Sequence, residues 1–260
     1  MECEQAIGKR KSRYWILASR IIDALRRRIL IYWVVRAPPV FRWLSLSQGD
    51  RVLDVGCGQG LWTLTIAPSV QHVVGLDLRT HSVQDAKNQS DRQGHRNASF
   101  VVASATALPF GDNSFDKILS IDVLDNIPDD HIAACEMARV LKRGGKLVAT
   151  ALLQDRRSYL RPIRYPEHIR NYSRKELSSL VESAGLELLG TFEFYRLFST
   201  VARELADIMH RSGISRIPGV GLLTAILLSG LARLDFLSSQ PGGGFGVVAT
   251  KPSRPGDCRD

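Results

Sequence analysis

Short apolar runs recur along the middle of the chain and are rich in β-branched residues. They stand at residues 51–55, 73–77, 100–103, 117–121 and 146–151. The segments between them carry apolar residues at three- and four-residue steps, as amphipathic helices do, and 80–93 is one such segment. Strands that alternate with helices predict a mostly parallel sheet covered by helices on both faces.

The pattern continues beyond residue 151. Ser173 and Glu176 form a capping box that opens a helix to about residue 184, and Gly185 ends that helix. Residues 187–195 and 245–250 are predicted to be two further strands.

A helix is also expected after Asp129, which is a candidate cap. Its core-facing residues are expected to be Ile132, Cys135, Ala138 and Leu141. Residues 142–145, Lys-Arg-Gly-Gly, are expected to end this helix before the strand at 146–151.

The region before the first strand favours one helix over 14–35, which the sequence Ala37-Pro38-Pro39 is expected to end. Arginines interrupt its apolar residues, so it is neither a secretory signal nor a membrane span. Tyr32 and Trp33 beside those arginines are typical of a helix on a membrane surface. A helix that packs over the core with solvated arginines explains the same pattern.

A long insertion separates the last two predicted strands. Phe198, Val201, Leu205 and Ile208 lie on one helical face. Residues 217–219 break that helix, and a very apolar helix is expected over 222–236. The uncharged run at 217–232 is shorter than the roughly 20 residues that span a bilayer, so burial and superficial membrane contact are the two interpretations.

Composition and charge narrow the class of protein. The chain has 260 residues, 44% of them hydrophobic and 23% charged, which is typical of a globular protein. Its net charge of +9 is concentrated in residues 1–45 and 155–170, which favours an anionic surface or substrate over a protein that coats nucleic acid. The four cysteines are scattered, so no disulfide framework or metal site is expected, and the cytoplasm is the expected compartment.

Glycines follow the strand at 51–55 directly, at Gly56, Gly58 and Gly60. Glycines at alternate positions let a ligand lie against the backbone, and the helix behind them offers free N–H groups. The next strand ends in Asp77, whose carboxylate can accept hydrogen bonds from a ribose diol at the edge of the sheet. Together these features predict a nucleotide-like ligand.

Asp54, Gly56, Gly58 and Gly60 match one by one the D-x-G-x-G-x-G motif of the class I S-adenosylmethionine (SAM) dependent methyltransferases, which this sequence therefore resembles. Leu108-Pro109-Phe110, the segment 114–121 and the string 139–150 resemble later motifs of the branch that methylates quinones, sterols and lipids. The resemblance implies a doubly wound, Rossmann-like α/β sheet of seven strands, parallel except for an antiparallel last strand. This chain would add a helical N-terminal arm and a helical insertion before that strand.

The resemblance also implies a cofactor, SAM. Its expected binding residues are Asp54, Gly56, Gly58, Gly60, Asp77, Leu78, Ser104, Ala105, Thr106 and Ile121. Ser104 stands where the family usually has an acidic residue that meets the adenine amino group, and a hydroxyl accepts that bond more weakly. The corresponding domains are 1–45 (basic arm), 46–195 (SAM-binding core), 196–244 (apolar cover over the acceptor) and 245–260 (last strand and tail).

The expected activity is methyl transfer from SAM to a small acceptor, either lipophilic or anionic, with peripheral membrane contact through the added helices. Asp122 and Asp125, just after the fourth strand, and the loop residue His168 are candidate general bases. Asn126 replaces a histidine that is common in the family.

Other classes of function stay open to different degrees. A SAM-binding protein without turnover and a nicotinamide-dependent oxidoreductase are the alternatives, although Leu61 breaks the dinucleotide glycine spacing. A nucleic-acid methyltransferase is disfavoured because the fourth strand ends in Ser120-Ile121-Asp122-Val123, which lacks the motif used on flipped bases.

Overall fold

The computed structural model of the protein describes residues 29–160, 169–213 and 220–253. The chain divides into two compact units. One contains the described residues of 39–156, 165–194 and 242–260 and holds the sheet. The other contains those of 1–38, 157–164 and 195–241 and is helical.

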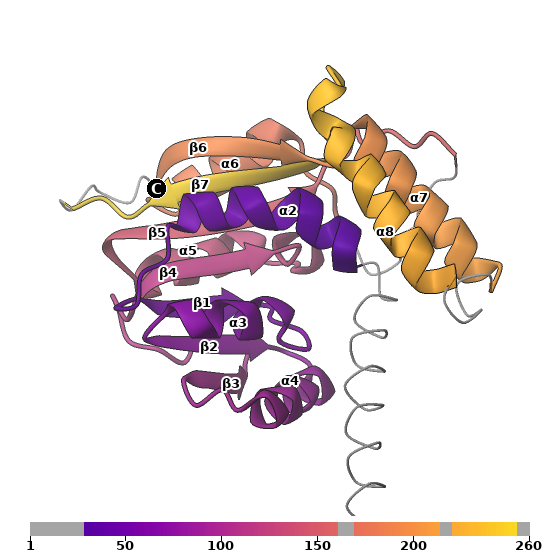
Figure 1. Cartoon of the computed structure of the whole chain (residues 1–260). Helices are drawn as coiled ribbons and strands as arrows, with labels where there is room; N and C mark the ends of the chain where they lie inside the picture. The colour runs from indigo at the N-terminus through magenta and orange to yellow at the C-terminus, as the bar shows by residue number, and fades with distance from the viewer. Residues whose placement is uncertain (1–28, 161–168, 214–219, 254–260) are drawn as a thin grey trace, which may run out of the picture. The chain divides into compact units, whose positions relative to one another are not determined.

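The sheet unit is built on seven strands (Figure 1). Their order across the sheet is β3-β2-β1-β4-β5-β7-β6. They are β1 (Arg51–Val55), β2 (His72–Asp77), β3 (Ala98–Val102), β4 (Phe115–Ile121), β5 (Leu141–Leu152), β6 (Glu187–Phe194) and β7 (Gly244–Thr250). The five strands from β3 to β5 pair in parallel, whereas β7 pairs antiparallel with both β5 and β6. This confirms the fold class expected from the sequence.

The strand order places a topological switch between β1 and β4. The chain leaves β1 toward β2 and β3, then returns to β4 on the other side of β1. In open sheets of this type, the crevice for ligands lies outside the carboxyl ends of the strands at such a switch.

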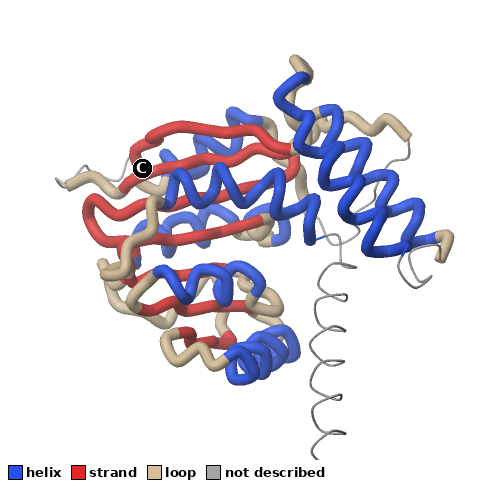
Figure 2. Tube along the Cα trace, viewed as in Figure 1, coloured by secondary structure: helices blue, strands red, loops and turns tan. Residues whose placement is uncertain are grey.

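Helices cover both faces of the sheet (Figure 2). In the sheet unit they are α3 (Leu61–Ile66), α4 (Thr80–Gln93), α5 (Asp130–Val140) and α6 (Arg174–Ser183), with the short 3-10 turns η1 (Ala67–Ser69) and η2 (Leu124–Asn126). The capping box of Ser173 and Glu176 opens α6 as predicted.

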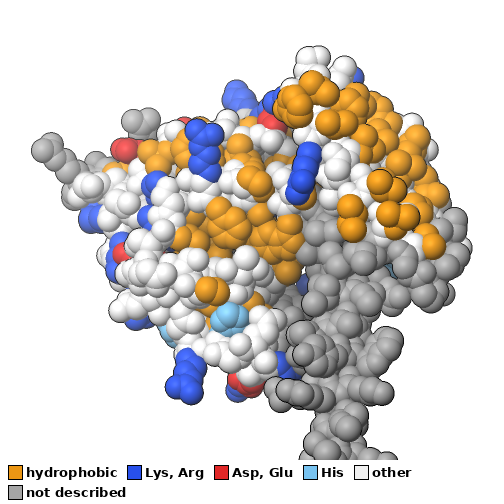
Figure 3. All heavy atoms as spheres, in the orientation of Figure 1, with side chains coloured by type: hydrophobic (Ala, Val, Ile, Leu, Met, Phe, Trp, Pro, Cys, Tyr) orange, Lys and Arg blue, Asp and Glu red, His pale blue; other side chains and the backbone are white. Residues whose placement is uncertain are grey.

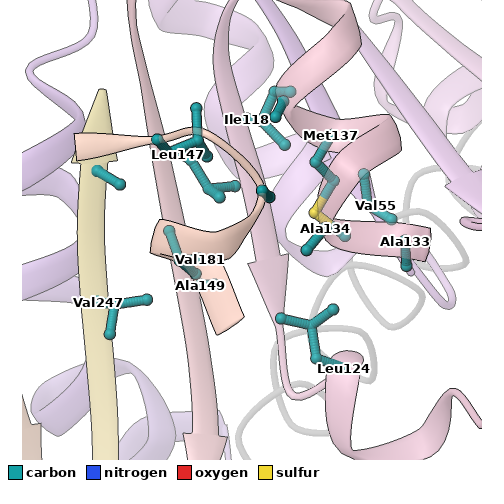
Figure 4. Close-up of a cluster of buried hydrophobic side chains, with 14 of the residues drawn as sticks. Val55, Ile118, Leu124, Ala133, Ala134, Met137, Leu147, Ala149, Val181 and Val247 are labelled. Atoms are coloured by element: carbon teal, nitrogen blue, oxygen red, sulfur yellow. The ribbon is translucent and has the colours of Figure 1, made fainter. Parts of the chain in front are cut away.

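Buried side chains from the strands and from α5 and α6 form the main core (Figure 4). Val55, Ile118, Leu147 and Val247 come from four neighbouring strands, and Met137 packs against them from α5. The central strands are apolar on both faces because helices cover both faces.

The buried face of α5 differs from the prediction. Ile132 and Cys135 are exposed, and the residues that α5 buries include Ala133, Ala134 and Met137. Ala138 and Leu141 are buried as predicted, so the prediction was right for two of its four residues. The small alanines bring the helix close to the sheet, and Met137 supplies the bulk. Asp129 precedes the helix but makes no capping bond with its side chain.

The end of α5 also lies earlier than expected. The helix stops at Val140, and β5 already begins at Leu141 instead of following the two glycines. Gly145 has no room for a side chain, because an added Cβ would lie 2.7 Å from the carbonyl oxygen of Lys142. The glycines therefore serve the strand and not the helix end.

The N-terminal helix contradicts the stop predicted at the prolines. Helix α2 (Ile29–Leu44) continues through Pro38 and Pro39, and the boundary between the two units falls between them. Proline removes a helical hydrogen bond, which normally costs about 3 kcal/mol. Burial of Val40 and Leu44 in the sheet unit offsets that cost and keeps the last turns helical. Residues 14–28 of the predicted helix lie outside the described residues.

The helical unit contains α7 (Leu197–Arg211), α8 (Val220–Ala232) and the 3-10 turn η4 (Arg233–Leu237), so the single helix expected over 222–236 ends at Ala232. Polar side chains are buried here. Glu204 of α7 accepts hydrogen bonds from the Ser158 hydroxyl and from the backbone N–H groups of Tyr159 and Leu160. These bonds compensate its burial.

Candidate functional site

A cavity of about 420 Å³ opens at the carboxyl ends of the strands, at the switch between β1 and β4. Its wall is made of Gly56, Leu76, Asp77, Leu78, Arg79, Ala103, Ser104, Ala105, Thr106, Asp122, Val123, Asn126, Ile127, Pro128 and Asp129. Six of the residues predicted to bind the cofactor, and one predicted base, therefore meet in one space. They are Gly56, Asp77, Leu78, Ser104, Ala105, Thr106 and Asp122.

The glycine turn has the backbone that its sequence predicts. Gly56, Gly58 and Gly60 all take left-handed conformations, with φ of 74°, 52° and 81°. At Gly56 an added Cβ would lie 2.3 Å from a methyl group of Val123, whereas at Gly58 it would meet nothing within 4 Å. The first glycine is thus required by packing, and the second leaves open space beside the backbone.

Asp77 connects the second strand to this turn. One carboxylate oxygen accepts the backbone N–H of Gly58 at 2.8 Å, and the other accepts that of Arg79 at 2.9 Å. Two bonds fix the carboxylate, and each oxygen keeps a further lone pair for a ligand hydroxyl. The Arg79 guanidinium lies 3.6 Å from the same group.

Asp54 lies behind the turn and is not among the residues that line the cavity. Its buried carboxyl group accepts the hydroxyl of Thr63, on α3, at 2.6 Å. Burial raises its pKa from 3.8 to about 7, and the negative charge of Asp77 adds to that effect. Burial likewise raises the pKa of the Cys57 thiol, which makes this thiol unreactive.

The part of the cavity wall formed by Leu78, Ser104 and Thr106 suits an adenine ring. Leu78 is 70% exposed although it is a large apolar residue, and it lines the cavity directly after Asp77. The hydroxyls of Ser104 and Thr106 lie 2.7 Å apart, and Ser104 also accepts the backbone N–H of Thr106. Leu78 offers an apolar surface, and Ser104 and Thr106 add polar groups beside it, a combination that is typical of ligand pockets.

Asp122 lies where β4 meets the cavity. Its backbone is left-handed (φ 56°), and its N–H donates to the carbonyl oxygen of Thr150 on β5 at 3.0 Å. Its carboxylate accepts the Thr150 hydroxyl at 3.2 Å. A non-glycine residue held in this conformation by its neighbours is a known mark of functional sites.

Asp125 is placed differently. It is fully buried, its side chain accepts an N–H of the Asn126 amide at 3.1 Å, and it is not among the cavity-lining residues. Asn126 donates also to the carbonyl oxygen of Asp122. The two residues thus fix the turn after β4, and of the two predicted carboxylates only Asp122 faces the cavity.

A second segment holds that turn from outside. Ile169 and Arg170 donate their backbone N–H groups to the Asp125 carbonyl oxygen. The Arg170 guanidinium donates to Asp130 at 2.5 Å and to the Pro128 carbonyl oxygen at 2.6 Å. The Tyr172 hydroxyl donates to the same Asp130 carboxylate, which raises the pKa of Tyr172 together with burial. We call residues 169–172, together with the residues of 124–130 that they bind, the wall clamp.

The other predicted residues lie apart from the cavity surface or outside the described chain. Gly58, Gly60 and Ile121 are not among the residues that line the cavity. His168 lies outside the described residues. No pattern in the sequence pointed to the wall residues Val123, Ile127 and Pro128 or to the wall clamp, since their roles follow from contacts far apart along the chain.

The formal charge of the cavity wall suits SAM. Asp77, Asp122 and Asp129 against Arg79 give its wall a formal charge of −2 (three negative, one positive), which suits the positive sulfonium. The residues that would hold the cofactor are the glycine turn, Asp77 and the Leu78 side of the cavity. Among the described residues no cluster of potential metal ligands occurs.

Comparison with known proteins agrees with this geometry. Residues 53–149 match the methyltransferase domain family. The chain is 30% identical over 188 residues to a demethylmenaquinone methyltransferase of Bacillus cereus, a match that covers 68% of this chain and 74% of that protein. The chain belongs to the class I SAM-dependent methyltransferase family. Its cofactor is accordingly SAM.

Two further relatives of this methyltransferase place it more broadly. The methyltransferase GfsG of Streptomyces halstedii is 35% identical over 165 residues, with 58% of this chain and 57% of GfsG covered. The chain spans about half the length of most of the relatives that it matches most strongly. The crystal structure of the [4+2]-cyclase SpnF is similar with a TM-score of 0.62 and 25% identity, covering 83% of this chain and 80% of SpnF.

Proposed function

We propose that this methyltransferase transfers a methyl group from SAM to a small, lipophilic acceptor. One observation carries the proposal. A single cavity brings together the carboxylate expected to hold the cofactor ribose, Asp77, and a carboxylate able to act as a base, Asp122. One relative is named a demethylmenaquinone methyltransferase and another, of Penicillium expansum, an O-methyltransferase, and both names support the same reaction class.

Each side of the cavity has a proposed task. Asp77 accepts the ribose hydroxyls, and Leu78 with Ser104 and Thr106 receives the adenine. The backbone at Gly56, which lines the cavity, receives the amino-acid end of the cofactor. Asp54 supports the turn through Thr63 without touching the ligand.

SAM, when bound, supplies an electrophilic methyl group, so the protein supplies proximity and a base. Asp122 is the proposed base, because its carboxylate lines the cavity and is oriented by the Thr150 hydroxyl. It would take the proton of an acceptor hydroxyl as the oxygen attacks. The negative charge of the cavity wall would also attract the positive sulfonium of SAM.

The acceptor side favours a lipophilic molecule. Val123, Ile127 and Pro128 give this wall apolar surface, and the formal charge of the cavity disfavours an anion. The positive charge in residues 155–170 suggested an anionic acceptor, but three arginines of this basic loop bind other residues of the protein. Arg156 donates to Asn171, Arg157 to Gln240, and Arg170 to Asp130. The anionic alternative therefore rests on Arg161 and Arg164, outside the described residues.

The test is a direct assay of turnover. Incubation with SAM and a panel of isoprenoid quinols and polyketide phenols should give S-adenosylhomocysteine and a product one methyl group heavier, as measured by mass spectrometry. Asp77→Ala should weaken SAM binding by about 1.5 to 3 kcal/mol in calorimetry, the range for lost charged hydrogen bonds. Asp91→Ala, an exposed position on α4, serves as the matched control.

One observation favours a second candidate. SpnF shares this fold and is named a [4+2]-cyclase, so the fold can support a reaction other than methyl transfer. A chain that binds SAM in an Asp77-dependent manner yet forms no S-adenosylhomocysteine with any acceptor would contradict methyl transfer and favour this second class. Unchanged SAM affinity in Asp77→Ala would contradict the assignment of the site itself.

We also propose a cytoplasmic protein with peripheral membrane contact, because a lipophilic acceptor partitions into bilayers. The described residues include no helix that is both long and apolar enough to cross a membrane. A contact of this kind would have to lie on the surface of the bilayer.

A further inference from the structure

Large apolar side chains are exposed along one side of α8 and the turn that follows it. Leu223, Ile226 and Leu227 are 57%, 54% and 62% exposed, and Phe236 of η4 is 78% exposed. Figure 3 shows the apolar side chains gathered over α8. We call this set the α8–η4 face; its members are Leu223, Ile226, Leu227, Leu234, Phe236 and Leu237.

The other side of α8 packs within its own unit. Leu228, Leu231 and Ala232 pack with Ala202 and Ala206 of α7 in one apolar cluster. The exposed residues are therefore not needed to join the two helices. A helix that met only water on its outer side would carry polar residues there, but Val220–Ala232 contains no charged residue.

Arg233, exposed at the start of η4, brings a positive charge to this face, whereas Arg211 is paired with Asp207 at 2.8 Å and Arg216 lies outside the described residues. Residues 208–234 contain three arginines, Arg211, Arg216 and Arg233, and no aspartate or glutamate. The next acidic residue, Asp235, is engaged with the start of α7, where it accepts the backbone N–H groups of Arg196 and Ser199. An apolar face beside a positive side chain is complementary to an anionic bilayer, whose interior is apolar and whose surface is negative.

We infer that the α8–η4 face docks on the surface of an anionic lipid bilayer. Helix α8 has 13 residues, about 20 Å at 1.5 Å per residue, which is less than the roughly 30 Å of a hydrocarbon core. It lies along the interface, with its leucines and Phe236 among the acyl chains and Arg233 at the lipid phosphates. This inference rests on the helical unit alone and not on the proposed methyl transfer.

The experiment is sedimentation of the full chain with vesicles of phosphatidylcholine, with and without phosphatidylglycerol. Binding is expected with phosphatidylglycerol and should fall at high salt, which screens the charge of Arg233. Replacing Arg233 with glutamine should weaken binding by about fivefold.

The apolar contribution is tested by Leu223→Gln, Ile226→Gln and Leu227→Gln together. These exposed positions tolerate glutamine without loss of packing, and glutamine is a good helix former. The triple variant should lose vesicle binding while its thermal unfolding is unchanged. Ile132→Gln, which replaces a similarly exposed apolar residue on α5 (49%), is the matched control and should bind as the wild type does.

Two outcomes would overturn the inference. Wild-type chain that stays in the supernatant with phosphatidylglycerol vesicles would exclude the bilayer as the occupant of this face. A dimer in light scattering that the triple glutamine variant abolishes, with no vesicle binding, would assign the face to a second copy of the chain. Because neither readout uses SAM, a failed methyl-transfer assay leaves this result unaffected.

Discussion

Asp122 has a left-handed backbone and lines the cavity just after the end of β4. If this group is the base, Asp122→Asn should lower kcat by at least about 100-fold, the lower end for a lost general base. Calorimetry should show a far smaller loss of SAM affinity than Asp77→Ala causes, because Asp122 adds charge to the wall but is not expected to hold the ribose or the adenine.

Asp91→Asn gives the control for that prediction, since this exposed position of α4 keeps the same change of charge away from the cavity lining. Equal kcat in Asp122→Asn and Asp91→Asn would show that proximity alone drives the reaction.

Asp54 predicts a pH dependence of stability. Burial raises its pKa from 3.8 to about 7, so the folded protein binds this proton more tightly than the unfolded chain does. The stability that the protonated group contributes is fully present below about pH 4 and is lost as the pH rises through about 7. A shift of this size corresponds to at most about 4 kcal/mol.

Asp54→Asn isolates that contribution because asparagine has the same shape and can still accept the Thr63 hydroxyl. Urea unfolding at a series of pH values should show the wild type losing stability relative to the variant between about pH 4 and pH 7. A constant difference across this range would mean that Asp54 is already ionised in the folded protein.

At the scale of elements, the wall clamp joins Ile169–Tyr172 to the turn after β4. Arg170→Ala would remove the guanidinium bonds to Asp130 and Pro128. The loosened wall should raise the acceptor KM by roughly tenfold, the effect of losing about 1.4 kcal/mol of interaction, with SAM affinity unchanged.

Arg174→Ala is the comparison for Arg170→Ala. Its guanidinium also joins two carboxylates, Asp155 and Glu193, but touches no residue of the cavity wall. If both variants raise KM alike, the effect reflects general loss of stability and not the position of the wall.

The sequence predicted the strands and the glycine turn well because each follows from local properties. The apolar runs marked the strands, and Gly56 to Gly60 supplied the left-handed turn. Helix α2 was misjudged because a local rule for proline was outweighed by the burial of Val40 and Leu44. The buried residues of α5 were predicted only in part, because Ala133 and Ala134 carry a weak hydrophobic signal in sequence and yet pack closely in space.

The candidate site was likewise predicted where it depends on local sequence and missed where it depends on contacts between distant residues. Asp77 and Asp122 were found because each follows directly on a strand, and the carboxyl ends of parallel strands meet at one edge. The clamp was missed because Arg170 and Asp130 are 40 residues apart, and no local pattern pairs them. The arginines of the basic loop were therefore predicted to bind a ligand, whereas Arg156, Arg157 and Arg170 bind other residues of the protein.

At the scale of the whole molecule, the two units divide the properties of the protein. The sheet unit holds the cavity with its acidic wall, and the helical unit carries the apolar α8–η4 face. The division of the chain into an arm, a core, a cover and a tail stays a prediction.

The position of β7 affects how the chain is made. This strand lies between β5 and β6, yet it emerges from the ribosome 50 residues after β6 ends (244 − 194). Until then β5 and β6 have no partner at this place, and exposed strand edges attract other chains. The cavity-forming strands β1 to β4 find their partners before that interval begins, so the half of the sheet that receives SAM can be complete during synthesis of the other half.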